Sequence, residues 1–207
     1  MKTYEPLSFS GRRVRLEPLA AEHAAPLLEA ASTARGTFSF TLVPADLPGF
    51  DRYISTALGE QGRGESMPFV VRDGTGTIVG STRYMMIEHW SWPGLPVEPV
   101  PSGPDALEIG FTWYAERVQR TALNTEAKLL LCTHAFDVWG ARRVTWKTDA
   151  RNARSRAGIE RLGARFDGVL RANRAAADGL VRDTAFYSML RSEWPDARAK
   201  LTARLAG

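Results

Sequence analysis

The chain has 207 residues, of which 44% are hydrophobic, 24% are charged and 10% are aromatic. This composition is typical of a globular protein and excludes a largely disordered one, and the length favours a single core. The lone cysteine, Cys132, excludes an internal disulfide and fits a reducing compartment. The sequence shows no signal-peptide core and no run of about 18 apolar residues, so we expect a cytoplasmic protein without a membrane span.

The net charge of +4 is modest, but the positive residues are concentrated in one stretch. Between Arg142 and Arg182 the chain has ten arginines and one lysine against four acidic residues. Such a stretch is either a solvated basic surface or a surface that receives phosphates or an acidic partner. Nucleic-acid binding is the weaker alternative, because no recognised motif or run of aromatic residues accompanies the arginines.

Hydrophobic spacing in the first half of the chain predicts three strands and two helices. These are a strand at 13–19, helices at 21–31 and about 47–59, and strands at 67–72 and 78–88. Pro18 is expected to end the first strand, because proline cannot donate to a sheet. The residues Asp73 to Gly76 have the composition of a hairpin turn between the second and third strands.

The second half predicts alternating strands and helices after a segment rich in proline, 90–105, that forms no regular element. The expected elements are strands at 107–114 and 143–148, helices at 121–139 and 153–162, strands at 165–173 and 181–190, and a surface helix at 193–205. The helix at 121–139 is apolar almost all round, so it must be buried on most sides. The whole pattern predicts one α/β domain over residues 1–207, with a core from about 11 to 190.

The segment 118–128, VQRTALNTEAK, leads into the long helix through small and polar residues. The first turn of a helix exposes backbone N–H groups and a partial positive charge, so it favours an anion such as phosphate. Thr121, Ala122 and Asn124 would allow a phosphate to approach the backbone, and Arg120 could add a cationic donor. A helix cap without a ligand explains the same residues, so the local pattern leaves both readings open.

The segments LEIGFTWY and QRTALNTEAKLLLCTHAFDVWGARRVTWKTDARNARSRAGIERLGARFDGVLR together resemble the GNAT superfamily of N-acetyltransferases, in the branch that includes the ribosomal-protein N-terminal acetyltransferases. GRRVRLEPL near the start and DGLVRDTAFYSML near the end are similar to that branch as well. The resemblance implies an α/β fold with a mixed, mostly antiparallel central sheet, splayed after its fourth strand, and helices on both faces. It also implies that acetyl-CoA binds in the splay as a co-substrate.

The pyrophosphate motif of this family is Gln or Arg, two residues, Gly, one residue, then Gly or Ala, and residues 119–124 (QRTALN) occupy it. Ala122 and Asn124 replace the two small positions, and asparagine tolerates a left-handed backbone. The resemblance therefore assigns the pyrophosphate of coenzyme A to this turn. The predicted cofactor-binding residues are Trp113, Tyr114, Gln119, Arg120, Thr121, Ala122, Leu123, Asn124, Thr125, Asn152 and Ser155.

Acetyl transfer to a primary amine needs a deprotonated amine, a donor for the carbonyl oxygen and a proton for the departing thiolate. A thioester is already activated, so we expect direct attack through a tetrahedral intermediate. Glu108 is the predicted base, on a strand face that it is expected to share with Gly110, Thr112 and Tyr114. A half-buried glutamate paired to an arginine is the structural alternative. A backbone N–H near Trp113 or Tyr114 would stabilise the oxyanion.

The general acid is less clearly indicated by the sequence. Ser155 lies about one turn into its helix, where related enzymes place a residue near the CoA sulfur, and capping or packing explains it equally well. Tyr187 is the second candidate, with core packing as its default role. Asn152 would bind the pantetheine arm, or it would only cap the helix.

Other chemically notable residues carry weaker signals. Trp90 and Trp92 either form an aromatic rim for substrate, contact a partner subunit, or fold back on the sheet. Cys132 is expected to be an inert core thiol. The three histidines lack metal-ligand spacing, so no metal site is predicted, and one of them is a weak alternative base. They are His23, His89 and, within the long helix, His134, of which His89 is that alternative base.

Three functions remain in competition at this point. The leading one is an acetyl-CoA-dependent N-acetyltransferase that acts on a protein N-terminus or on a small-molecule amine. A sensor that binds acetyl-CoA without turnover is kept open by Ala122 and Asn124, although Glu108 speaks against it. A basic nucleic-acid or ribosome-binding protein is the third. The acceptor and the oligomeric state are left open, a homodimer included.

Overall fold

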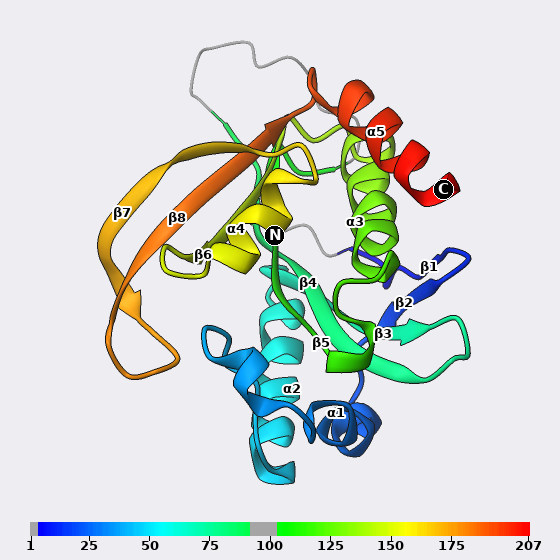
Figure 1. The fold of residues 1–207 in the computed structure, drawn as a ribbon. Coiled ribbons are helices and arrows are strands. Elements are labelled where there is room, and N and C mark those ends of the chain that lie inside the picture. Colours follow the sequence, from blue (N-terminus) through cyan, green and yellow to red (C-terminus); the bar gives the residue numbers. More distant parts are fainter. Residues whose placement is uncertain (1–3, 92–102) are drawn as a thin grey trace.

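An eight-stranded mixed sheet runs through the computed structural model, which describes residues 4–91 and 103–207 (Figure 1). The strand order is β1-β2-β3-β4-β5-β6-β8-β7. The strands are β1 (Phe9–Ser10), β2 (Val14–Pro18), β3 (Ser66–Asp73), β4 (Ile78–Glu88), β5 (Ala106–Tyr114), β6 (Arg143–Asp149), β7 (Arg165–Ala175) and β8 (Val181–Leu190). Every neighbouring pair is antiparallel except β5 and β6, so the predicted mixed, mostly antiparallel sheet is confirmed.

Helices cover both faces of this sheet. They are α1 (Ala24–Ala31), α2 (Leu47–Gly62), α3 (Leu123–Thr133), α4 (Ala153–Glu160) and α5 (Trp194–Ala206). One core cluster joins the sheet to α3, α4 and α5, and a second joins it to α1 and α2. Figure 1 shows α3 and α5 side by side, and α1 and α2 packed together at the other end of the molecule. No helix in the described ranges is both long and apolar enough to span a bilayer.

The predicted elements are present, with corrections at their boundaries. The two-residue strand β1 was not predicted, because a pair of residues carries no alternation. Helix α3 begins at Leu123 rather than at residue 121, and its last turn, His134–Val138, is π-helical before Gly140 adopts a φ of 71°. Cys132 is buried in the core, as predicted, and burial raises the pKa of its thiol to about 12.

The sheet parts between β5 and β6. These strands pair over three positions only, from Ala106 with Arg143 to Glu108 with Thr145. Beyond them β5 continues to Tyr114 and β6 to Asp149, and in the described residues these two strands do not pair with each other again. The predicted splay after the fourth strand is confirmed. The fourth predicted strand, 107–114, corresponds to β5, because the short strand β1 was not predicted.

A bulge in β5 changes which side chains share a face. Ser81 pairs with Trp113 and Arg83 with Gly110, so two residues of β5 lie opposite the single residue Thr82 of β4. Phe111, inside the bulge, has a φ of 47°. The prediction that Thr112 and Tyr114 share the strand face of Glu108 and Gly110 is therefore wrong. Tyr114 instead joins the core under α3, whereas Trp113 packs in the core under α1 and α2.

The bulge is braced by a buried arginine. The guanidinium of Arg83 lies 4.2 Å from the ring centroid of Phe111 and 5.2 Å from that of Tyr53. Its Nη1 also donates to Glu60 of α2 at 2.8 Å. Aromatic faces attract such a cation, and the attraction is stronger where water is excluded. The left-handed residue Phe111 thus packs on a guanidinium that α2 itself holds in place.

Candidate active site

A cavity of about 870 Å³ opens between β5 and β6, where these strands diverge. Residues from both strands, the turn before α3, the start of α4, the β7–β8 hairpin and the segment 37–42 line it. Glu108 is the one acidic side chain among its described lining residues. The cationic lining residues are Arg120, Lys128, Lys147, Arg154, Arg161, Arg174, Arg182 and Arg204. This excess of positive charge favours anionic ligands.

The turn before α3 forms one wall of the cavity. Arg120 has a φ of 61°, and the Thr121 hydroxyl donates to the Val118 carbonyl at 2.8 Å. Ala122 is the N-cap residue of α3, and Asn124 lies within the first helical turn. The left-handed residue of the turn is therefore Arg120, whereas Asn124 lies in the helix. The N–H groups of the first turn have no partners inside the helix, and apart from that of Leu123, which donates to the Thr121 hydroxyl, they are available to an anion.

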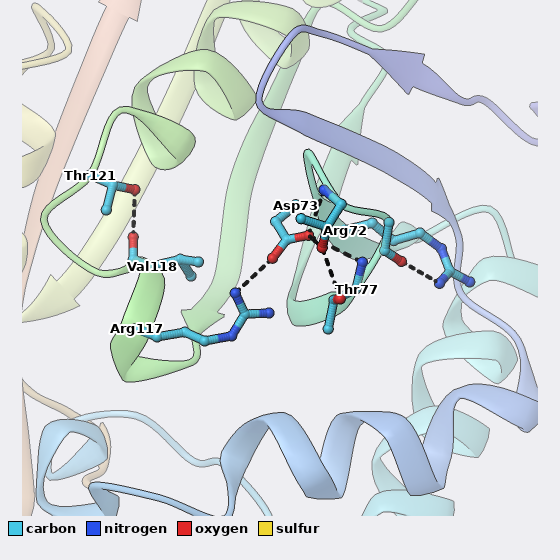
Figure 2. A network of polar contacts seen from close by, with 8 residues as sticks. Arg72, Asp73, Thr77, Arg117, Val118 and Thr121 are labelled. Carbon is cyan, nitrogen blue, oxygen red and sulfur yellow. Dashed lines mark hydrogen bonds and ion pairs between the residues drawn. The ribbon is translucent and has the colours of Figure 1, made fainter.

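A second layer of polar contacts holds this turn in place, as Figure 2 shows. Arg117 donates to the Asp73 carboxylate at 2.7 Å, at the end of β3. The same carboxylate accepts from the backbone and hydroxyl of Thr75 and from the backbone of Thr77. Burial acts to raise the pKa of Asp73, but these hydrogen bonds lower it below the usual value overall. The hairpin turn between β3 and β4 thus anchors the segment that leads into α3.

Gln119 connects the turn to two other walls of the cavity. Its Nε2 donates to the Tyr114 carbonyl at 2.8 Å and to the Thr37 hydroxyl at 3.2 Å. Arg154 of α4 donates to the Gln119 Oε1 at 3.1 Å and to the Thr37 carbonyl at 2.6 Å. These bonds bring β5, α4 and the segment after α1 together at the mouth of the cavity.

The start of α4 brings Asn152 and Ser155 to the opposite wall. The Asn152 Oδ1 accepts from the Ser155 backbone N–H at 3.0 Å, so the predicted N-cap is confirmed. Both residues line the cavity, and the Ser155 hydroxyl forms no hydrogen bond to any other described residue. The hydroxyl is therefore available to a ligand.

Glu108 lies on the floor of the splay and is 6% exposed. Its Oε2 pairs with Lys147 Nζ at 2.9 Å, so its partner is a lysine of β6 rather than the arginine of the structural alternative. A Cβ at Gly110 would lie 3.0 Å from Glu108 Oε1 and 2.7 Å from Met85 Sδ. Glycine at this position thus keeps a side chain away from Oε1.

Lys128 is a cavity residue that the sequence analysis missed. It is 3% exposed, and its Nζ donates to the hydroxyls of Thr112 at 2.7 Å and Thr82 at 3.0 Å. Burial lowers the pKa of Lys128 to about 7. A lysine in the middle of a largely apolar helix was the signal in the sequence that could have revealed it.

Several predicted site residues lie elsewhere in the structure. Tyr187 is fully buried outside the cavity lining, where its hydroxyl accepts from Arg156 and donates to Glu160. Its position does not support the predicted role as general acid. Leu123 also leaves the predicted set, because its side chain points into the core under α3.

The predicted substrate-binding tryptophans and the alternative base also lie apart from the cavity. Trp90 donates from Nε1 to Glu88 at 2.8 Å and stacks under Arg143, outside the cavity lining. Trp92 lies outside the described residues. His89 shares a hydrogen bond with Tyr4 at 2.9 Å and does not line the cavity either.

Comparison with known proteins identifies the fold. The family model for the acetyltransferase (GNAT) domain matches residues 13–165. The chain belongs to the GNAT acetyltransferase family. The solved structure of a GCN5-related N-acetyltransferase from Brucella melitensis is 31% identical with a TM-score of 0.82, over 98% of this chain and 86% of that one. These matches confirm the predicted fold and the enzyme class of N-acetyltransferase.

Two further relatives of this GNAT protein are informative. An acetyltransferase structure from T. thermophilus is 33% identical with a TM-score of 0.78, over 99% of this chain and 100% of that one. YdaF of Bacillus subtilis (strain 168), named as a ribosomal N-acetyltransferase, is 33% identical over 87 residues. That stretch is 42% of this chain and 46% of YdaF, so it spans about half the length of the curated relative.

Proposed function

We propose that this GNAT protein transfers the acetyl group of acetyl-CoA to a primary amine, either the N-terminus of a protein or the amine of a small molecule. The observation that carries the proposal is the arrangement of the cavity. The first turn of α3 forms one wall and the glutamate Glu108 lies on its floor. A site for a large anionic donor and a base for an amine thus occur in one continuous space.

The donor end of the cavity has groups suited to coenzyme A. The turn before α3 offers backbone N–H groups and the Arg120 guanidinium to the pyrophosphate. Asn152 lines the same cavity from the start of α4 and is placed to contact the pantetheine arm.

The acceptor amine would attack at the floor of the splay. Its nitrogen forms a bond to the thioester carbon, and Glu108 receives the amine proton, directly or through a water molecule. Lys147 pairs with Oε2 of this carboxylate, which leaves Oε1 facing the space over Gly110. Unpaired backbone N–H groups of β5, near Trp113 and Tyr114, would stabilise the oxyanion of the tetrahedral intermediate.

The intermediate then collapses with cleavage of the carbon–sulfur bond. The sulfur leaves as a thiolate and needs a proton to become coenzyme A. Ser155 is the candidate donor, because its hydroxyl lines the cavity and its backbone is fixed by the Asn152 cap. The splay between β5 and β6 brings this side of α4 opposite the α3 turn, so the donor can be held between them.

The test combines binding with turnover. We expect acetyl-CoA to bind with micromolar Kd in titration calorimetry. A panel of amines is then screened as acceptors by measuring the release of the coenzyme A thiol. Glu108→Gln should keep that Kd and lower kcat/KM for the best amine by about 10²- to 10⁴-fold, as expected for loss of a base. Glu29→Gln, an exposed change on α1, serves as the matched control and should leave both values unchanged.

The outcomes separate the competing functions. If acetyl-CoA does not bind at millimolar concentration, the acetyltransferase proposal is wrong. If it binds but neither the wild type nor any variant turns over amines, the non-catalytic sensor is favoured. Full activity of Glu108→Gln across the pH range would remove this residue from the mechanism while leaving the donor site intact.

A further inference from the structure

A group of polar side chains on the β7–β8 hairpin faces the cavity beyond Glu108. Strand β8 places Arg182, Thr184 and Phe186 on one face, alternating with the core residues of the other face. Phe186 pairs with Lys147, whose ammonium lies 5.1 Å from the Phe186 ring centroid and 2.9 Å from Glu108. This face of β8 is therefore continuous with the side of the sheet from which Glu108 is reached.

Two of these side chains have unsatisfied polar atoms. Thr184 is 1% exposed, lines the cavity, and its Oγ1 has no hydrogen-bond partner among the described residues. The buried Nε of Arg182, another lining residue, has none there either, and its guanidinium forms no ion pair within the described part of the chain. Buried hydroxyl and guanidinium groups are nearly always paired in proteins. Both atoms thus point to a ligand with acceptor oxygens.

The charges around these atoms give the sign of that ligand. Arg174 of β7 pairs across from Arg182 and also lines the cavity. Burial, followed by the nearby Arg174 charge, lowers the pKa of Arg182. The Arg174 side chain is exposed, whereas Arg182 is partly buried, and their like charges repel each other. The carboxylates of Asp149 and Glu108 offset part of this repulsion, and Glu108 is already paired with Lys147. An anion bound between the two arginines would remove the rest of that cost.

We propose that the acceptor carries an anionic group, a carboxylate or a phosphate, as well as its amine, and that this group binds to Arg182, Arg174 and Thr184. The inference rests on the proposed function, because it names the acceptor of the same cavity. Thr184 is two residues from Phe186, which is about 7 Å along the strand. The anionic group is therefore several bonds away from the amine at Glu108, as in a peptide with an acidic second residue.

The experiment compares acceptors that differ only in this charge. The probes are hexapeptides that begin Ala-Glu or Ala-Gln, a phosphoserine peptide against its serine counterpart, and 5-aminovalerate against its amide. We expect the acidic member of a pair to have the higher kcat/KM by about tenfold, the usual contribution of a charge-assisted hydrogen bond. In Arg182→Gln this preference should fall to about twofold or less.

The control is Arg171→Gln, which removes the same charge from an exposed position of β7 outside the cavity lining. It should keep the preference for acidic acceptors. Equal use of acidic and neutral acceptors by the wild type, or an unchanged preference in Arg182→Gln, would overturn the inference. Acetyl-CoA binding in the same samples separates this failure from a failure of the proposed function.

A second measurement covers the case in which no probe is acetylated. Glutarate and inorganic phosphate are titrated into the protein saturated with coenzyme A, with the shift in melting temperature as readout. We expect stabilisation in the wild type and in Arg171→Gln, and its loss in Arg182→Gln. An equal shift in all three proteins, or no shift in any, would contradict an anion site at these residues.

Discussion

At the scale of single residues, Lys128 is the least expected feature of the site. An ammonium group is strongly hydrated, and its transfer into a buried position without a carboxylate partner disfavours the charged form. In this structure the Nζ of Lys128 instead donates to two threonine hydroxyls. With its pKa lowered to about 7, close to half of these side chains are neutral at neutral pH. Lys128 is therefore a group beside the cavity that can bind or release a proton near neutral pH.

Lys128 should make stability depend on pH. Between about pH 7 and the ordinary lysine pKa, the unfolded chain binds a proton at this residue and the folded chain does not, so the unfolding free energy rises with pH. The slope expected from one group is about 1.4 kcal/mol per pH unit at most. In Lys128→Met this slope should disappear, and the variant should be more stable than the wild type at pH 7. Urea unfolding at pH 7, 8 and 9 measures it.

The control for that series is Lys200→Met, an exposed position of α5. It should follow the wild-type profile at all three pH values. The neighbouring thiol, Cys132, titrates in the unfolded chain within this pH range, but it does so equally in the wild type and in Lys128→Met, so the difference between their profiles reports Lys128 alone. Parallel profiles of the wild type and Lys128→Met would show that Lys128 is charged in the folded protein.

How far the sequence predicts this site depends on the residue. Glu108 and Gly110 could be placed because alternation along a strand is local and glycine leaves space wherever it stands. The partner of Glu108 could not, because Lys147 comes from a strand that lies beyond the whole of α3 in the sequence, and the register between β5 and β6 decides the contact. Lys128 was hidden for the same reason: the burial that changes its pKa comes from strands far from it in sequence.

At the scale of elements, the turn before α3 is supported from outside itself. Its left-handed residue is an arginine, which is an uncommon conformation for a side chain of that size. Strained backbone of this kind persists where surrounding contacts determine it. The contact of Arg117 with Asp73 (Figure 2) and that of Gln119 with Arg154 supply that support. The loop that receives the pyrophosphate in the proposal is thus pre-formed.

Arg117→Met tests this support without touching the ligand. The Arg117 side chain is exposed over about half its surface, so its loss should cost little stability, on the order of 1 kcal/mol or less. The turn would lose its link to the β3–β4 hairpin, and we expect the Kd for acetyl-CoA to rise about three- to tenfold. Calorimetry measures the affinity, and thermal unfolding shows that the fold is kept.

Arg63→Met gives a matched comparison for that change. Arg63 forms a surface ion pair with Glu65 at the same 2.7 Å distance, but it lies at the end of α2 and does not line the cavity. It should leave the affinity for acetyl-CoA unchanged. If both variants bound acetyl-CoA as the wild type does, the network in Figure 2 would be irrelevant to the site.

Periodic patterns predicted the elements well, but they could not reveal the bulge. The stretch LEIGFTWY reads as continuous alternation, and a bulge adds one residue without a sequence signature apart from Gly110 beside it. That single extra residue moved Tyr114 to the core under α3 and left Trp113 under α1 and α2. The cause lies in long-range packing, above all that of Arg83 on Phe111.

At the scale of the whole molecule, the splay divides the sheet. Strands β1 to β5 form one continuous antiparallel block, and β6, β8 and β7 form another. Among the described residues, backbone pairing between the two blocks is limited to the three residue pairs between β5 and β6, and both blocks contribute to the core cluster under α3. Hydrogen bonds missing between the diverging strands leave backbone groups that a ligand can satisfy. An acetyl-CoA molecule in the cavity would contact both blocks and act as a bridge.

Acetyl-CoA should therefore stabilise the protein as a whole. At a concentration 100 times its Kd, a ligand that binds only the folded state adds about 2.7 kcal/mol to the unfolding free energy. For a domain of this size that corresponds to a rise in Tm of about 5–10 °C. Ala122→Tyr, with a large side chain at the N-cap of α3, is the control and should show a far smaller rise.

Hydrogen exchange of β5 and β6 should slow together on binding in the wild type, because a bridging ligand restrains both strands at once. Slower exchange in one block alone, or an equal rise in Tm for Ala122→Tyr, would place the ligand outside the splay.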